Sequence, residues 1–338
     1  MKTKPIKTKF KAAIGRAGQL FNRAACLGAV ILICSSASAQ NLFVSGTDAH
    51  GGEIYKFTWD GKQSIFASGL YKPLGMAFDS AGNLFVVDYE ILDNVGIAAV
   101  YKIAPNGAQT IFASRLSYHS SLAVDRAGNV FVADYDQGII YEYKSTGSRA
   151  TFATGLHHPV GLAFDSLGDL FVANNSAGMY QGQIYQYKPN GSRTTFAVLD
   201  SADRPADLAF DSMGGLLMAD LGGNIYRYDP PGTLRRHPRT TFGSVPDSAQ
   251  SLAFDTAGNL FVVDAGGVKG SGGANPNAIY KFTRLGARST FASAGSADER
   301  FACVAFRPMS QESSDQANRL LPVPTPRPRP TPFPRPTP

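Results

Sequence analysis

The chain has 338 residues, of which 43% are hydrophobic and 17% are charged, and its formal net charge is +6. Seven of its 32 Lys and Arg residues, and none of its 26 Asp and Glu residues, precede position 40. Residues 40–313 carry 21 basic and 25 acidic residues, a balance that excludes nucleic acid as an expected partner.

The N-terminal segment 1–39 joins a basic leader to the short apolar run LGAVILIC (27–34) and ends in an Ala-x-Ala site at Ala39. This pattern is typical of a secretory signal peptide. The alternatives are an uncleaved anchor, for which the run is shorter than the roughly 20 residues a bilayer needs, and a lipoprotein modified at Cys34. We expect a secreted, periplasmic or cell-envelope protein, cleaved near Ala39, with no transmembrane span in the mature chain.

A phrase such as GLAFDSLGDLFVAN (161–174) recurs along the rest of the sequence. Its first apolar segment ends in an Asp that returns every 40 to 46 residues, and an Arg takes the sixth place. These positions are Asp79, Asp125, Asp165, Asp211, Asp255 and Arg307. A fixed period of this length is typical of four-stranded propeller blades.

Each repeat unit contains four short segments that are rich in β-branched and aromatic residues and are bounded by Gly, Asn, Asp and Pro. Such segments are predicted to be strands, and nothing after the leader has helical periodicity. Residues 41–44 form a second segment and residues 304–306 a first one, so together they complete a blade. We therefore predict an all-β, six-bladed β-propeller over 40–313, closed by pairing of the N- and C-terminal strands.

From Leu321 onward, Pro occupies alternate positions, which removes the backbone donors that a helix or sheet needs. We expect 314–338 to be a disordered Pro-rich tail, with contact to the cell envelope as the alternative. Cys26 and Cys34 lie in the leader, so Cys303 alone would remain after cleavage and could form no internal disulfide. We expect Cys303 to be buried rather than nucleophilic.

The phrase PVGLAFDSLGDLFVAN, followed by GQIYQYKPNG, resembles the NHL repeat and the gluconolactonase-like propellers. The resemblance covers about 40–310. It implies that the connections from fourth to first strand and from second to third strand share one face, called here the ligand face. Propellers of this kind include lactonases, lyases and binding modules, so the resemblance does not decide the activity.

The recurring Asp at the first turn is expected to hold a hairpin on the opposite face. A second polar series ends the second strand, on the ligand face, and Glu90 follows in the same connection. This series is Asp88, Asp134, Asn174, Asp220 and Asp264. We expect it to satisfy loop amides, with a part in lining the channel mouth as the alternative.

In gluconolactonase-like enzymes, acidic and amide residues just before the first strands hold a divalent metal. Here the matching residues are Leu74, Ser120, Val160, Ala206, Gln250 and Ala302. None is a carboxylate, which argues against that mechanism unless Asp203 or Asp207 approaches the axis through a different register. No GxSxG elbow, phosphate loop or HExxH sequence occurs.

Four of the five histidines fall on ligand-face connections, and three around an axis could hold a metal. The candidates are His50, His119 and His158, with Tyr118, Tyr89 and Arg204 for proton transfer or anion contact. The connections 88–99 and 264–278 are also long enough to build a binding surface. We predict a binding or scaffold module for a small molecule, glycan or protein, with no required cofactor. The alternative is a metal-dependent lactonase or lyase.

Overall fold

The computed structural model describes residues 40–48, 51–92, 95–116, 121–175, 181–229, 239–266, 277–295 and 299–308. The described residues form strands and turns without a helix, so none of them belongs to a helix that could cross a membrane. The strands are β1 (Leu42–Asp48), β2 (Gly51–Phe57), β3 (Gln63–Leu70), β4 (Pro73–Phe78), β5 (Leu84–Leu92), β6 (Val95–Ile103), β7 (Gln109–Leu116), β8 (Ser121–Val124), β9 (Val130–Asp134), β10 (Ile139–Tyr143), β11 (Arg149–Ala153), β12 (Pro159–Phe164), β13 (Leu170–Asn174), β14 (Gln183–Tyr187), β15 (Arg193–Val198), β16 (Pro205–Phe210), β17 (Leu216–Asp220), β18 (Asn224–Tyr228), β19 (Arg239–Ser244), β20 (Ala249–Phe254), β21 (Leu260–Asp264), β22 (Ala278–Phe282), β23 (Arg288–Ser293) and β24 (Arg300–Phe306).

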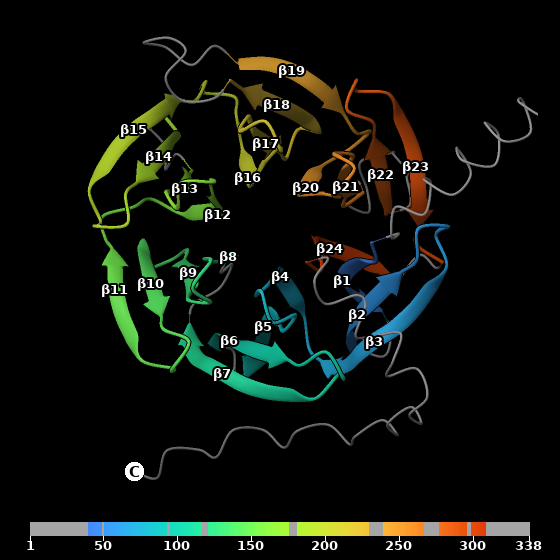
Figure 1. Ribbon diagram of the computed structural model, residues 1–338, viewed down its shortest axis with the longest axis horizontal. Helices are drawn as coiled ribbons and strands as arrows, with labels where there is room; N and C mark the ends of the chain where they lie inside the picture. The colour runs from blue at the N-terminus through green and yellow to red at the C-terminus, as the bar shows by residue number, and fades with distance from the viewer. Residues whose placement is uncertain are drawn as a thin grey trace, which may run out of the picture. The chain divides into compact units, whose positions relative to one another are not determined.

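These strands form six antiparallel four-stranded sheets arranged as blades around a central axis (Figure 1). Five blades use four consecutive strands, and the sixth has the order β24-β1-β2-β3. In that blade Leu42 pairs with Phe306 and Val44 with Val304. The predicted six-bladed propeller and its closure by the two terminal strands are therefore confirmed.

The hydrophobic core lies between the blades, in six clusters that each join neighbouring sheets. Phe131 is representative: its ring meets those of Phe152 and Phe164 edge-to-face, with centroids 5.1 Å away in each case. Ala163, on the inner strand, packs with Leu208 of the next blade. A small residue recurs at this position because neighbouring inner strands approach each other closely around the axis.

The recurring Asp of the first turn holds a hairpin, as expected from the sequence. In the β12–β13 turn, one carboxylate oxygen of Asp165 accepts the amides of Leu167 at 2.8 Å and Asp169 at 2.9 Å. Gly168 has a φ of 87°, which disfavours any residue with a side chain. The geometry fits a structural role for this series.

Arg307 replaces that Asp in the closing blade and is 1% exposed. Its guanidinium carbon lies 4.9 Å from the ring centroid of Phe43 and 5.4 Å from those of Phe66 and Phe78. The backbone carbonyl of Arg307 accepts a hydrogen bond from the side chain of Gln40 at 2.5 Å. The end of the last strand is thus fixed to the start of the first.

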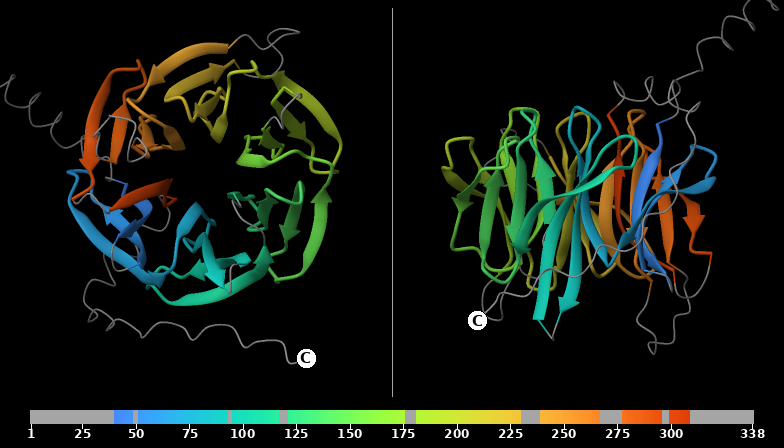
Figure 2. Two further views of the ribbon diagram at one scale, coloured as in Figure 1. Left: turned by 180° about the vertical axis from the view of Figure 1, so that it is seen from behind. Right: turned by 90° about the horizontal axis from the view of Figure 1, so that it is seen from below.

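The segment 88–99 differs from the loop expected from the sequence. Strand β5 runs on to Leu92 and β6 begins at Val95, so the two form a long hairpin that continues the blade. The hairpin projects beyond the neighbouring connections in the edge-on view of Figure 2. The sequence did not predict these longer strands because apolar and polar residues alternate only weakly in this segment. The strands extend because the two halves of the segment pair with each other.

Candidate functional site: the central channel

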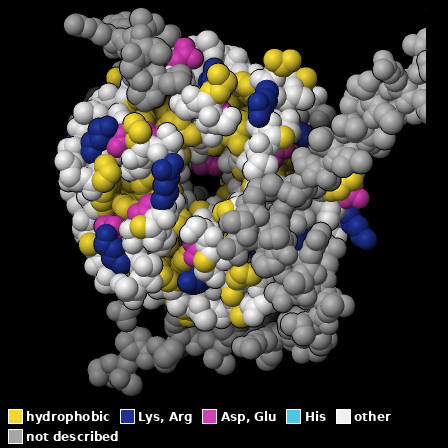
Figure 3. Space-filling view, in the orientation of Figure 1, with side chains coloured by type: hydrophobic (Ala, Val, Ile, Leu, Met, Phe, Trp, Pro, Cys, Tyr) yellow, Lys and Arg dark blue, Asp and Glu magenta, His cyan; other side chains and the backbone are white. Residues whose placement is uncertain are grey.

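The inner strands β4, β8, β12, β16, β20 and β24 surround a cavity of about 620 Å³ on the propeller axis. The ring has a hollow at its centre in the space-filling view (Figure 3). The cavity walls are mainly aliphatic. Its polar side chains, among the described residues, are Ser121, Tyr135, Asn175, Asp207, Gln250, Ser251 and Cys303.

A β-bulge at the start of the inner strands sets which residues meet around this channel. In β12, Pro159 pairs with Asn174 and Gly161 with Ala173, so Val160 is an extra residue in the ladder. The same irregularity occurs in β16 and β20. A Cβ atom on Gly161 would lie 3.0 Å from the Cα of Asp207, so the position after the bulge faces the next blade.

The position after the bulge is the consensus glycine of the repeat, and polar residues occupy it on the successive strands β16, β20 and β24 and on β8 across the channel. Around the ring it reads Gly75, Ser121, Gly161, Asp207, Ser251 and Cys303. The resemblance to gluconolactonase-like enzymes pointed to the residue one place earlier in each repeat, and Asp207 was expected near the axis only if the register differed. The sequence signal that could have identified this set is the replacement of the consensus glycine by Ser, Asp or Cys at the same position of four repeats.

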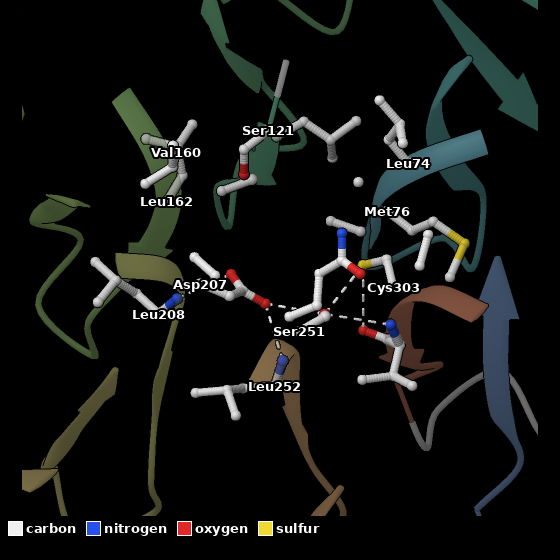
Figure 4. Close-up of a pocket in the computed structure, with 18 of the residues that line it drawn as sticks. Leu74, Met76, Ser121, Val160, Leu162, Asp207, Leu208, Ser251, Leu252 and Cys303 are labelled. Carbon is white, nitrogen blue, oxygen red and sulfur yellow. Dashed lines mark hydrogen bonds between the residues drawn. The ribbon is translucent and has the colours of Figure 1, made fainter. Parts of the chain in front are cut away.

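Three of these residues form a hydrogen-bonded series across successive blades (Figure 4). The Ser251 hydroxyl donates to the Asp207 carboxylate at 2.9 Å, and the Leu252 amide donates to the same oxygen at 2.9 Å. The amide of Val304 donates to Ser251 Oγ at 3.3 Å, and Cys303 Sγ lies 3.3 Å from that oxygen. The series therefore connects β16, β20 and β24.

Burial changes the protonation of both titratable groups in this series. It raises the pKa of Asp207 to about 6, although the amides of Leu252 and Leu208 and the hydroxyl of Ser251 favour the charged form. Burial, together with the charge of Asp207, raises the pKa of Cys303 to about 12. The thiol is protonated at neutral pH and is a poor nucleophile.

His158 does not line the cavity itself but contacts Tyr135, which does. Its ring stacks on that of Tyr135, with centroids 4.3 Å apart and an interplanar angle of 13°. Its φ of 52° is the only positive value at a non-glycine residue in the described part of the chain. The amide of Asn175 donates to the His158 carbonyl at 3.2 Å, which helps to hold this unusual backbone.

The second polar series holds the ligand-face loops together. The Asp88 carboxylate accepts the amides of Tyr71 and Lys72, and burial raises its pKa to about 6. The other members make similar bonds: Asp134 accepts the Gln137 amide, Asn174 that of His157, Asp220 those of Arg204 and Gly222, and Asp264 those of Ser248 and Gly266. None of the five lines the cavity. These contacts fit the expected role in satisfying loop amides.

The other predicted site residues that the structure describes, Arg204, Tyr89 and Glu90, do not line the channel. Arg204 is exposed and donates to the carbonyl of Leu221 at 3.3 Å. The Lys72 ammonium lies 5.9 Å from the ring centroid of Tyr89, and Glu90 is half-buried on the β5–β6 hairpin. His50, Tyr118 and His119 lie outside the described residues.

The described residues do not fit the divalent metal site of the lactonase alternative. Across them, no group of three His, Cys, Asp or Glu side chains is placed to hold an ion. Asp207 is the one carboxylate among the described residues that lines the cavity, and its oxygens already accept the Ser251 hydroxyl and two backbone amides. A hard cation needs several oxygen ligands, and this part of the chain supplies too few of them around the channel.

Neither protein-family models nor curated proteins yield a match to this chain. Solved structures do. A chain of the nidogen/laminin complex aligns at 18% identity over 80% of this chain and 98% of its own, with a TM-score of 0.63. A gluconolactonase from Xanthomonas campestris aligns at 17% identity over 79% and 88%, with a TM-score of 0.56. The PQQ-bound aldose sugar dehydrogenase from Streptomyces coelicolor aligns at 15% identity over 71% and 90%, with a TM-score of 0.57.

At these identities the similarity concerns the fold, and the proteins that share it include both enzymes and components of a protein complex. The chain is a six-bladed β-propeller of the NHL and gluconolactonase-like fold.

Proposed function

We propose that this protein is a binding propeller that takes a small, largely apolar ligand into its central channel from the ligand face. The observation that carries this proposal is the cavity of about 620 Å³, with mainly aliphatic walls and a few polar groups. Small-molecule sites commonly have volumes of about 300–1,000 Å³ and this kind of lining.

The chemistry of the cavity favours binding over catalysis. Its thiol, Cys303, has a raised pKa, and Ser251 lacks a neighbouring histidine among the described residues. The nidogen/laminin and gluconolactonase structures show that the fold can serve either purpose, so they do not decide between the two. The metal-dependent alternative would require ligands from outside the described ranges.

The proposed biological setting is extracytoplasmic. The segment 1–39 would direct export, and the Pro-rich tail 314–338 would hold the propeller near a partner or the cell envelope. This setting is independent of the channel. Cell fractionation of the full chain, with and without residues 314–338, would test it; loss of envelope association on tail removal is the expected result.

Binding to the channel can be tested with phenylnaphthylamine, an uncharged apolar dye whose fluorescence rises in apolar surroundings. Ala302 lines the cavity at a bulge, so Ala302→Trp should fill the mouth and weaken dye binding at least about tenfold. Ala81→Trp, at an exposed turn on the opposite face, is the matched control and should bind as the wild type does. Unchanged binding by a folded Ala302→Trp protein would contradict the proposal.

A further inference from the structure

The channel cavity carries a single formal negative charge and no positive one among its described lining residues. Of the described residues, Asp207 is the only Asp or Glu that lines it, and no Lys, Arg or His of the described ranges does so. Asp207 also forms no ion pair within the described ranges. A carboxylate held among apolar groups without a counter-cation is costly, and a cationic ligand would relieve that cost.

The hydrogen bonds of Asp207 leave acceptor capacity on one oxygen. Oδ2 accepts the Ser251 hydroxyl and the Leu252 amide, each at 2.9 Å, whereas Oδ1 accepts the Leu208 amide at 2.8 Å. A carboxylate offers about four lone-pair sites. The remaining site belongs to Oδ1, and the carboxylate lies at the edge of the open channel in Figure 4.

The wall opposite Asp207 is apolar. The inner strands follow one another around the ring, so β4 lies across the channel from β16, and it presents Leu74 and Met76 to the cavity. Val160 and Leu162 of β12, the strand beside β16, add further apolar groups to the cavity, and Ser121 of β8 adds a hydroxyl between β12 and β4. The cavity therefore has its negative charge on one side and faces it with the mainly aliphatic residues of β4.

We infer that the ligand of the channel is an amphipathic organic ammonium ion, whose N–H donates to Asp207 Oδ1 while its apolar part packs against Leu74, Met76 and Val160. This inference rests on the proposed binding function and names its ligand class. Charge-assisted hydrogen bonds are stronger than neutral ones, and an anion would meet the carboxylate as a like charge. The expected order of affinity is cation above neutral analogue above anion.

The inference also predicts a pH dependence of amine affinity. The ammonium ion needs ionised Asp207, whose pKa burial raises to about 6, so amine affinity should rise as pH increases through that value. Among the described residues that line the cavity, Cys303 and Tyr135 are the other titratable groups, and burial keeps the Cys303 thiol protonated over this range. The affinity of a neutral analogue should change little.

The test uses three probes of equal chain length: phenylbutylamine, phenylbutanol and phenylbutyrate. Each is titrated against phenylnaphthylamine bound to the wild type, to Asp207→Asn, and to Asp60→Asn as a control. Asp60 lies on an exposed turn between β2 and β3, so its substitution makes the same charge change away from the channel. Amine affinity of the wild type is also measured from pH 5 to pH 8, an interval of about three pH units around the Asp207 transition.

In the wild type and in Asp60→Asn, the amine should displace the dye at a concentration at least about tenfold lower than the alcohol. In Asp207→Asn this preference should disappear while the alcohol binds as before. Equal displacement by amine and alcohol in the wild type, a preference that survives in Asp207→Asn, or a flat pH profile would each overturn the inference. If Ala302→Trp still blocks the dye in those cases, channel binding stands and the ligand class alone is wrong.

Discussion

The partly buried carboxylate of Asp207 should make the stability of the propeller depend on pH in an unusual direction. Burial raises its pKa from 3.8 to about 6, so between these values the folded protein binds more protons than the unfolded chain. The contribution of Asp207 to stability is therefore full at low pH and is lost as pH rises through about 6. The usual carboxylate in an ion pair behaves in the opposite way.

The size of the effect follows from the pKa change. A tenfold change in proton affinity is worth about 1.4 kcal/mol, so a shift of this extent corresponds to roughly 3 kcal/mol. Asp207→Asn removes the titrating group. The unfolding free energy of this variant minus that of the wild type should therefore increase by up to about 3 kcal/mol as the pH rises from 4 to 7.

Urea unfolding of both proteins at intervals from pH 4 to pH 7 measures this difference. Ser251→Ala provides a second variant, because it removes a hydroxyl that donates to the carboxylate at 2.9 Å. That loss should raise the pKa of Asp207 further and move the fall in stability to higher pH. A difference between wild type and Asp207→Asn that stays constant over the whole range would refute the reasoning.

Two further substitutions test the closure of the ring and its turns. Phe301, on β24, is 1% exposed, so Phe301→Ala should cost about 3–5 kcal/mol in unfolding free energy. The control Ile111→Ala, at a side chain that is 51% exposed, should cost less than about 0.5 kcal/mol. Equal urea midpoints for the two variants would contradict the closure. Asp255 accepts the Asn259 amide at 2.7 Å, so Asp255→Ala should lower the thermal midpoint and cost about 1–2 kcal/mol of unfolding free energy. Asp255→Asn should retain most of the wild-type stability. A larger loss in the Asn variant would instead indicate a role for the charge.

The fold was predictable because its signal is repeated. Asp165 and its equivalents fixed the period, and the position of the last segment, 304–306, implied that it completes the first blade. The β24–β1 pairing confirms this. Six copies of one pattern constrain each other, so an error in any single strand would not have changed the architecture.

The candidate site was less predictable because its geometry depends on long-range contacts. Asp207 meets Ser251 across 44 positions of sequence, and the bulge at Ala206 moves the channel-facing register by one residue. Alternation within a strand cannot reveal such a bulge. Tyr135 was missed for a similar reason, since only the folded chain brings it onto His158.

The central claim, that the ligand occupies the channel, can be tested most directly at Cys303. The thiol lines the cavity and lies 3.3 Å from Ser251 Oγ, beside Asp207. Because burial keeps this thiol protonated at neutral pH, its slow alkylation by iodoacetamide is followed over hours at about pH 9, where the thiolate fraction is larger. Mass mapping of the Cys303 peptide gives the rate with and without saturating phenylnaphthylamine. Occupation of the channel predicts that the dye slows alkylation in proportion to its occupancy, whereas an unchanged rate at saturation would contradict binding in the channel.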